Sequence, residues 1–138
     1  MKPLALLERL AAQEVKRERQ ALAALDETLE RRQRDLAGEL AAAAQERRAA
    51  DDLADAALYA RWLAGSRQRQ ERARREVERL EQARAEQTTR LIERRLARKR
   101  LEVLRARAEQ RHAADMRRRE QRQADEVAVM RAAQRGRG

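Results

Sequence analysis

The position of its only proline is the feature that most constrains the fold of this chain. Proline breaks a helix when it lies in the interior, but the first helical turn tolerates it. The single proline here is Pro3, and the rest of the chain is mainly Ala, Leu, Arg, Glu and Gln. These residues are strong helix formers. No segment shows the alternation of polar and apolar residues that is typical of a β-strand. The sequence therefore predicts an all-α protein with very long helices.

Apolar residues recur at steps of three, four and seven, which places them on one face of a helix. In the first half this stripe comprises Leu4, Leu7, Ala11, Val15, Leu22, Leu25, Leu29, Leu36 and Leu40. In the second half it comprises Val77, Leu80, Leu91, Ile92, Leu96, Leu101, Val103, Leu104, Ala108 and Met116. Arg32 and Glu39 interrupt the first stripe, and the second drifts between positions 92 and 101.

Neither half can bury such a stripe alone, so we expect one chain to fold back on itself. The predicted fold is an antiparallel coiled-coil hairpin of two long helices, the second longer than the first. We expect one helix over 4–49, a turn about 49–55, a second helix over about 55–134, and a frayed basic tail at 135–138.

The residues themselves leave two positions open for the turn. Gly65 and Ser66 form one candidate, because Gly often ends a helix and Ser often begins one. The other is residues 47–55, where two arginines would end the first helix and three aspartates would begin the second. This order of charges suits the helix dipole. On that second placement, Gly65 lies inside a helix.

The composition argues against an enzyme. The chain is 42% charged and 1% aromatic, without Cys, and has a single histidine, His112. A lone histidine on a basic helix has no partners for metal binding or for nucleophilic catalysis. We therefore expect no catalytic residue, no cofactor and no metal. The N-terminus reaches Glu8 too early for a signal peptide and no apolar run suits a membrane span, so we expect a cytoplasmic protein.

Positive charge is concentrated in the second half of the chain. Residues 1–65 contain 11 Lys+Arg and 12 Asp+Glu, a net charge of −1, whereas residues 66–138 contain 23 and 12, a net charge of +11. Such a segment favours a partner with negative potential. A basic coiled coil that binds nucleic acid is one alternative, although Arg and Glu alternate on most turns. A generic adaptor or dimerisation coiled coil is another.

Three stretches resemble the FliJ/YscO family, the small coiled-coil stalk proteins of flagellar and other type III export machines. Residues 4–15 read LALLERLAAQEV, residues 59–63 read YARWL, and residues 118–128 read RREQRQADEVA. The ending DEVA followed by a short basic segment is closer to the flagellar branch. In that family the turn precedes the mid-chain aromatics, which favours a turn at residues 49–55.

The resemblance implies a non-enzymatic stalk that contacts the hexameric export ATPase, the cytoplasmic domain of the export gate, and export chaperones. It would be peripheral to the inner membrane through these partners. It implies an export-gate contact formed by Leu58, Tyr59, Trp62 and Leu63. It implies an ATPase contact formed by Leu4, Leu7, Leu10, Arg117, Arg118, Arg119, Glu120, Gln123, Asp125 and Glu126. Each set has a simpler interpretation: the apolar residues as coiled-coil seam, and the charged run as solvated helix surface.

The chain departs from the family pattern just after the aromatic pair. Apolar residues often follow there in the family, whereas this sequence has Ser66, Arg69 and Ala73. The resemblance therefore leaves the size of the gate contact open.

Overall fold

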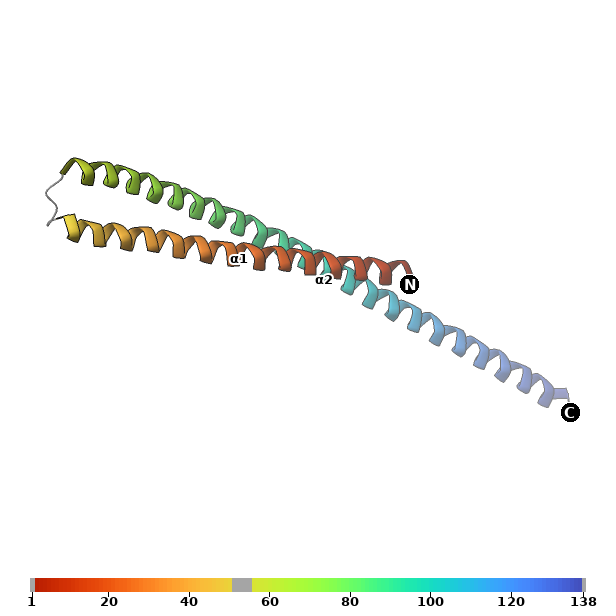
Figure 1. Ribbon diagram of the computed structural model, residues 1–138. Helices are drawn as coiled ribbons and strands as arrows, with labels where there is room; N and C mark the ends of the chain where they lie inside the picture. Colours follow the sequence, from red (N-terminus) through yellow and green to blue (C-terminus); the bar gives the residue numbers. More distant parts are fainter. Residues whose placement is uncertain (1, 51–55, 138) are drawn as a thin grey trace. The chain divides into compact units, whose positions relative to one another are not determined.

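Two long helices make up the described part of the protein. The computed structural model describes residues 2–50 and 56–137. Helix α1 spans Lys2–Ala50, 49 residues, and helix α2 spans Ala56–Arg137, 82 residues (Figure 1). Neither described segment contains a strand. The all-α prediction, with the second helix longer, is confirmed.

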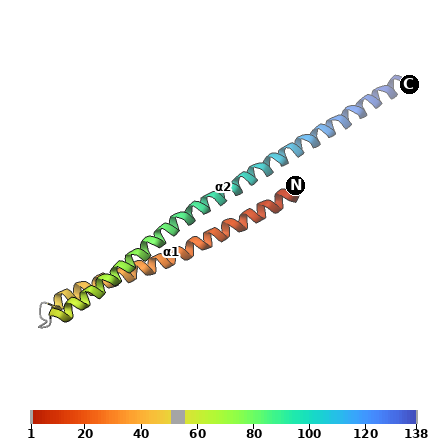
Figure 2. The ribbon, with the colours of Figure 1, turned by 90° about the horizontal axis from the view of Figure 1, so that it is seen from above.

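The chain divides into two compact units, and both helices contribute to each. The central unit comprises residues 14–94, and the terminal unit comprises residues 1–13 and 95–138. In the central unit, α1 and α2 run in opposite directions along each other (Figures 1 and 2). Cross-helix contacts show this direction directly, because Glu14 pairs with Arg94 whereas Glu39 pairs with Arg69. The predicted antiparallel coiled-coil hairpin is therefore confirmed.

The apolar seam of the central unit is narrow. Its largest cluster consists of buried Leu29, Val77 and Leu80, with Leu25 and Leu36 packed against them. Val15 and Leu91 are also buried, at 2% and 4% exposure. Along both helices the buried and half-buried positions follow the three-four spacing of a coiled coil. A seam of this width buries one stripe of each helix and leaves the remaining faces exposed.

Polar residues occupy several seam positions of the central unit. Ser66 is fully buried, and its hydroxyl accepts a hydrogen bond from Nε2 of Gln70 at 3.3 Å. Gln87 is 4% exposed, and its Nε2 donates to the backbone oxygen of Glu18 at 3.1 Å and also to the Glu18 carboxylate. These groups satisfy one another, so the seam tolerates them. A polar layer in a coiled coil also helps to fix its register.

Charged pairs flank this seam from one helix to the other. Arg94 Nη1 lies 3.2 Å from Glu14 Oε2, and Arg69 Nε lies 3.4 Å from Glu39 Oε2. A third pair joins Arg84 to Asp26. Glu39, which interrupts the apolar stripe in the sequence, is therefore compatible with the hairpin because it faces an arginine.

In the terminal unit, a charged contact joins the two helices. Arg105 Nη1 lies 2.7 Å from Glu8 Oε2, and Arg105 Nε lies 3.1 Å from Glu109. The hydrogen bond to Glu8 and the attraction of both carboxylates raise the pKa of Arg105. Ala11 is buried, whereas every residue described in 115–137 is exposed.

Several sequence expectations differ from the structure. Gly65 and Ser66 lie inside α2, where no glycine has a positive φ, so they do not form the turn. The preferred turn falls largely on residues 51–55, which lie outside the described residues. Helix α1 begins two residues before the expected position 4, and α2 continues to Arg137 through the expected tail.

The apolar stripes also extend less far than expected. Leu7 and Leu40 are 47% and 41% exposed, so they lie outside the buried seam of α1. The stripe predicted for the second helix includes five exposed residues: Ile92, Leu96, Val103, Leu104 and Met116. The drift of the stripe between positions 92 and 101 explains this, because Leu91 is buried while its neighbour Ile92 projects outward.

Candidate functional site

The mid-chain aromatic residues lie on the first turns of α2, which begins at Ala56. The rings of Tyr59 and Trp62 are stacked, with centroids 6.2 Å apart and an angle of 19° between their planes. Tyr59, Trp62 and Leu63 are half-buried, whereas Leu58 is 61% exposed. The four residues lie together on the first turns of α2, and we call them the aromatic patch. Stacked aromatic side chains of this kind provide much contact area with little conformational freedom to lose.

The three residues that follow the aromatic patch are engaged in the hairpin. Ser66 is buried, Ala73 is half-buried, and Arg69 pairs with Glu39. Small and polar side chains at these positions let α1 and α2 approach each other, so they do not enlarge the patch. This finding limits the aromatic patch to residues 58–63.

The leucines at the start of α1 are only partly used by the hairpin. Leu4 is half-buried, whereas Leu7 and Leu10 are 47% and 46% exposed. Leu6, which the sequence interpretation left out, is the most exposed of the group at 54%. The three leucines at positions 6, 7 and 10 form an exposed apolar surface, the N-terminal leucine surface. Its signal in the sequence was the density of leucines over 4–10, more than one helix face can bury.

The predicted charged run lies on a fully exposed part of α2. Arg117, Arg118, Arg119, Glu120, Gln123, Asp125 and Glu126 are all exposed. Arg118 forms an ion pair with Asp115 at 3.6 Å, and Asp125 accepts a hydrogen bond from Gln121 at 3.2 Å. Both contacts link neighbouring turns of α2, so neither ties the run to α1. The side chains are therefore free to meet another molecule.

Exposed apolar residues follow directly after this run. Val127, Val129 and Met130 are 45%, 68% and 63% exposed. Sequence reasoning placed Val127 in a family motif but missed Val129 and Met130, because the apolar spacing ends at Met116. With the charged run they form a surface that we call the C-terminal surface, comprising residues 117–130.

The terminal unit therefore combines apolar and basic surfaces. It contains the N-terminal leucine surface on α1 and the C-terminal surface on α2. Residues 95–138 contain 14 Lys+Arg and 6 Asp+Glu, a net charge of +8. Such a combination suits a protein partner whose surface is acidic and partly apolar.

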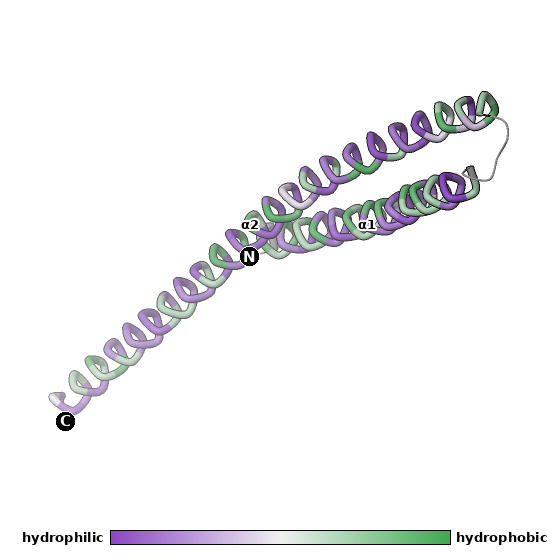
Figure 3. Tube along the Cα trace, turned by 90° about the vertical axis from the view of Figure 1, so that its left-hand side faces the viewer, coloured by the Kyte–Doolittle hydropathy of each residue, from purple (hydrophilic) through white to green (hydrophobic). Residues whose placement is uncertain are grey.

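Neither helix offers a metal site or a membrane span over the residues described. No group of three His, Asp or Glu side chains is arranged to hold a metal ion in 2–50 or 56–137. Within the same ranges, no stretch of helix has both the length and the apolar character needed to cross a bilayer. Figure 3 shows why, since hydrophobic and hydrophilic residues alternate along α1 and α2.

Comparison with known proteins gives one match. The family model described as "Flagellar FliJ protein" matches residues 1–137. Searches of the curated proteins and of the solved structures gave no match. The family match covers both helices, and therefore the aromatic patch and both surfaces of the terminal unit.

Proposed function

The chain belongs to the flagellar FliJ family, whose members are structural stalk components of the flagellar export apparatus, and from this premise we propose that it couples the export ATPase to the export gate. On this proposal the terminal unit enters the central opening of the hexameric ATPase and promotes its activity. The aromatic patch binds the cytoplasmic domain of the export gate. The protein is cytoplasmic, reaches the membrane only through these partners, and also meets export chaperones.

The observation that carries the ATPase contact is the exposure of the terminal unit. Every residue described in 115–137 is exposed, although the segment is continuous helix. An exposed helix that has apolar side chains at 127, 129 and 130 is not stabilised by packing within its own chain. Its charged run supplies guanidinium groups, whose planar fork suits carboxylates and polar loops. A partner that surrounds this helix would satisfy both kinds of side chain.

The gate contact is supported by the position and chemistry of the aromatic patch. The patch holds the only Trp and the only Tyr of the chain. Part of the patch remains accessible to solvent, because Leu58 is 61% exposed and Trp62 is half-buried. Trp and Tyr are enriched among residues that dominate binding energies at protein interfaces.

Nucleic-acid binding is less well supported by the side-chain contacts. Arg69, Arg84, Arg94 and Arg105 of α2 each pair with a carboxylate of α1. These arginines are therefore not available as a continuous basic face for phosphates. The two aromatic rings stack on each other rather than standing apart as platforms for bases.

Charge reversal of the arginine run tests the ATPase contact. Replacing Arg117, Arg118 and Arg119 by Glu should abolish stimulation of the export ATPase, because the variant presents acidic groups where the proposal needs basic ones. The control variant replaces Arg17, Arg19 and Arg67, exposed arginines of the central unit, and changes the net charge equally. Circular dichroism should show both variants folded. Normal stimulation by the first variant would refute the assignment of this run.

A further inference from the structure

The stretch of α2 from residue 96 to residue 111 has an exposed face that takes no part in the proposed contacts. Leu96, Val103 and Leu104 of this stretch are exposed, although leucine and valine favour burial. A shallow hollow of about 360 Å³ lies over the middle of the stretch. Its lining residues are Lys99, Arg100, Val103, Leu104 and Arg107. The whole stretch belongs to the terminal unit.

The opposite side of the same stretch meets α1. Arg105 contacts Glu8, and Arg98 and Glu102 line a hollow of about 250 Å³ together with the first turns of α1. Steps of three and four place residues 98, 102 and 105 on this side of the helix, and residues 96, 100, 103 and 107 on the other side. Helix α1 therefore leaves the second side uncovered. We call it the outer face, and it comprises Leu96, Arg100, Val103, Leu104, Arg107 and Arg111.

The charges of this stretch are unequally divided between its two sides. Its two acidic residues, Glu102 and Glu109, pair with neighbouring cations on the side that meets α1. Arg100, Arg107 and Arg111 are exposed and have no ion pair within the part of the chain that the structure describes. The outer face therefore combines three apolar side chains with three unpaired guanidinium groups, and no carboxylate of its own lies among them.

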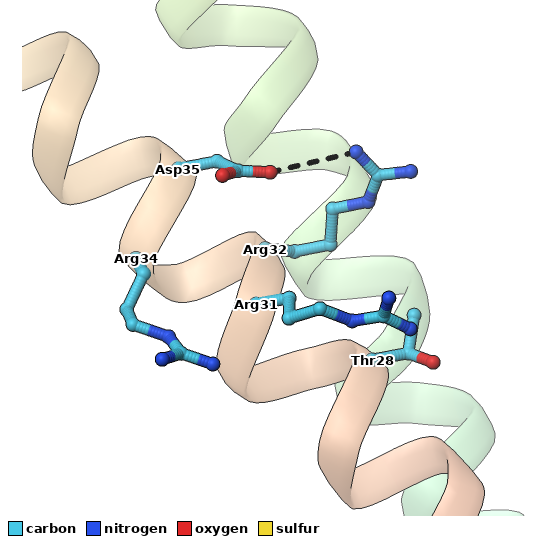
Figure 4. A pocket seen from close by; sticks show the side chains of 5 residues that line it. All are labelled: Thr28, Arg31, Arg32, Arg34 and Asp35. Carbon is cyan, nitrogen blue, oxygen red and sulfur yellow. Dashed lines mark ion pairs between the residues drawn. The ribbon is translucent and has the colours of Figure 1, made fainter.

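A basic hollow on α1 differs from the outer face in one respect. Its lining residues are Thr28, Arg31, Arg32, Arg34 and Asp35 (Figure 4). Arg32 lies 3.6 Å from Asp35, while Arg31 and Arg34 extend away from that pair. This hollow has two unpaired arginines but no large apolar side chain among its lining residues. It can therefore serve as a control for the effect of positive charge alone.

We propose that the outer face docks an acidic amphipathic α-helix of a partner protein. The apolar side chains of that helix cover Leu96, Val103 and Leu104, and its Glu or Asp side chains pair with the three unpaired arginines. The outer face is about 24 Å long, at 1.5 Å per residue, so a partner helix of four to five turns would cover it. It is separate from the aromatic patch, the N-terminal leucine surface and the C-terminal surface.

The arrangement of the outer face favours a protein helix over other occupants. A second copy of this face would bring arginines against arginines, and like charges repel. An amphipathic helix that lies on a membrane carries its cations on the polar face, whereas Arg100 and Arg107 lie within the same stripe as Leu96 and Val103. Nucleic acid would pair with the arginines but would leave the apolar side chains against phosphate groups.

Binding of a synthetic helix tests the proposal. The probe is a fluorescent peptide of about 21 residues, three heptads, with Leu along one face and Glu on both flanks. Two comparison peptides each change one property. The reordered peptide has the same composition with its Leu residues spread around the helix, and the basic peptide has Lys in place of every Glu. We expect fluorescence anisotropy at about 50 mM salt, where charge screening is weak, to show saturable binding of the probe only.

Paired charge variants locate the binding. Replacing Arg100 and Arg107 by Glu should raise the Kd of the probe at least about tenfold, because the partner carboxylates would then face carboxylates. The control replaces Arg31 and Arg34 of the α1 hollow by Glu and changes the net charge equally. It should change the Kd less than about twofold. Circular dichroism should show both variants as helical as the parent protein.

Paired leucine variants test the apolar part of the contact. Leu104→Ala should raise the Kd of the probe about tenfold, because truncation removes an apolar side chain from the contact. The control is Leu40→Ala, at a leucine of α1 with similar exposure, 41% against 49% for Leu104. It should change the Kd less than about twofold. Alanine favours helix at both positions, so the two proteins should stay folded.

Several results would overturn the proposal. They are equal binding of the reordered or the basic peptide, no binding of the probe at about 1 mM, and an unchanged Kd for either outer-face variant. Another is tighter binding of duplex DNA or of anionic lipid vesicles that is lost when Arg100 and Arg107 are replaced. None of these measurements uses the export ATPase or the export gate, so a failure here leaves the proposed stalk function standing.

Discussion

Leu29→Ala tests whether the narrow seam of the central unit holds the two helices together. Leu29 is 8% exposed and forms the main cluster with Val77 and Leu80. Truncation of a buried leucine to alanine destabilises proteins by about 2–5 kcal/mol, depending on how far the surroundings close over the cavity. A seam between only two helices is open along both sides, so neighbouring side chains and water can fill the cavity that the truncation leaves. We therefore expect a loss at the lower end, about 2–3 kcal/mol.

A loss of this size is large for a protein with so small a core. Domains are typically stable by only about 5–15 kcal/mol. At roughly 4 °C per kcal/mol for a chain of this length, the melting temperature should fall by about 10 °C. Urea denaturation would measure the free energy of unfolding. Circular dichroism would report helix content, and Trp62 fluorescence would report the first turns of α2.

The matched control is Leu6→Ala, the same substitution on the same helix at a site that is 54% exposed. Both substitutions gain the same small helix propensity, so their difference reports burial. We expect Leu6→Ala to lower the free energy of unfolding by no more than about 0.5 kcal/mol. Equal effects at the two sites would refute the seam, because they would mean that Leu29 is no more buried than Leu6 in solution.

Two other predictions concern the aromatic patch and the response to acid. Trp62→Ala should weaken binding to the cytoplasmic domain of the export gate by about tenfold or more in calorimetry, with helicity retained; unchanged affinity would remove the patch from the gate contact. Glu76 has its pKa lowered from 4.5, chiefly by the hydrogen bond from Arg79 at 2.6 Å. Its stabilising effect is therefore present above that ordinary value and lost as the pH falls through the lowered one. In acid titrations of thermal stability, Glu76→Gln should lose less between about pH 6 and pH 3 than the parent protein; parallel curves would contradict this.

The sequence predicts the helices well because their signals are local. One early proline, abundant helix formers and three-four apolar spacing are each readable without tertiary information. The position at which the buried seam ends does not depend on local sequence. Leu91 and Ile92 are equally apolar, and only the packing of α1 against α2 decides that Leu91 is buried while Ile92 is 52% exposed.

The polar residues of the seam were also beyond sequence reasoning. Ser66 and Gln87 are not typical core residues, and they are buried only because Gln70 and Glu18 satisfy their hydrogen bonds. Likewise, Glu39 reads as an interruption until Arg69 is found beside it, 30 positions along the chain. Such pairings depend on the register of the hairpin, which periodicity alone does not determine.

The candidate sites also divide into features that the sequence predicts and features that only the structure shows. The aromatic patch and the arginine run could be located from the sequence, because rare residue types and charge runs stand out in it. The exposed Leu6, Val129 and Met130 could not, because an exposed apolar residue looks the same in a sequence as a buried one.

The most direct test of the stalk function is ATP hydrolysis by the export ATPase of the same flagellar system, measured while this protein is titrated in. A stalk in the centre of a ring can be present only once, so we predict stimulation that saturates near one copy per ATPase hexamer. Saturation near six copies, or no stimulation by protein that circular dichroism shows to be folded, would contradict the account.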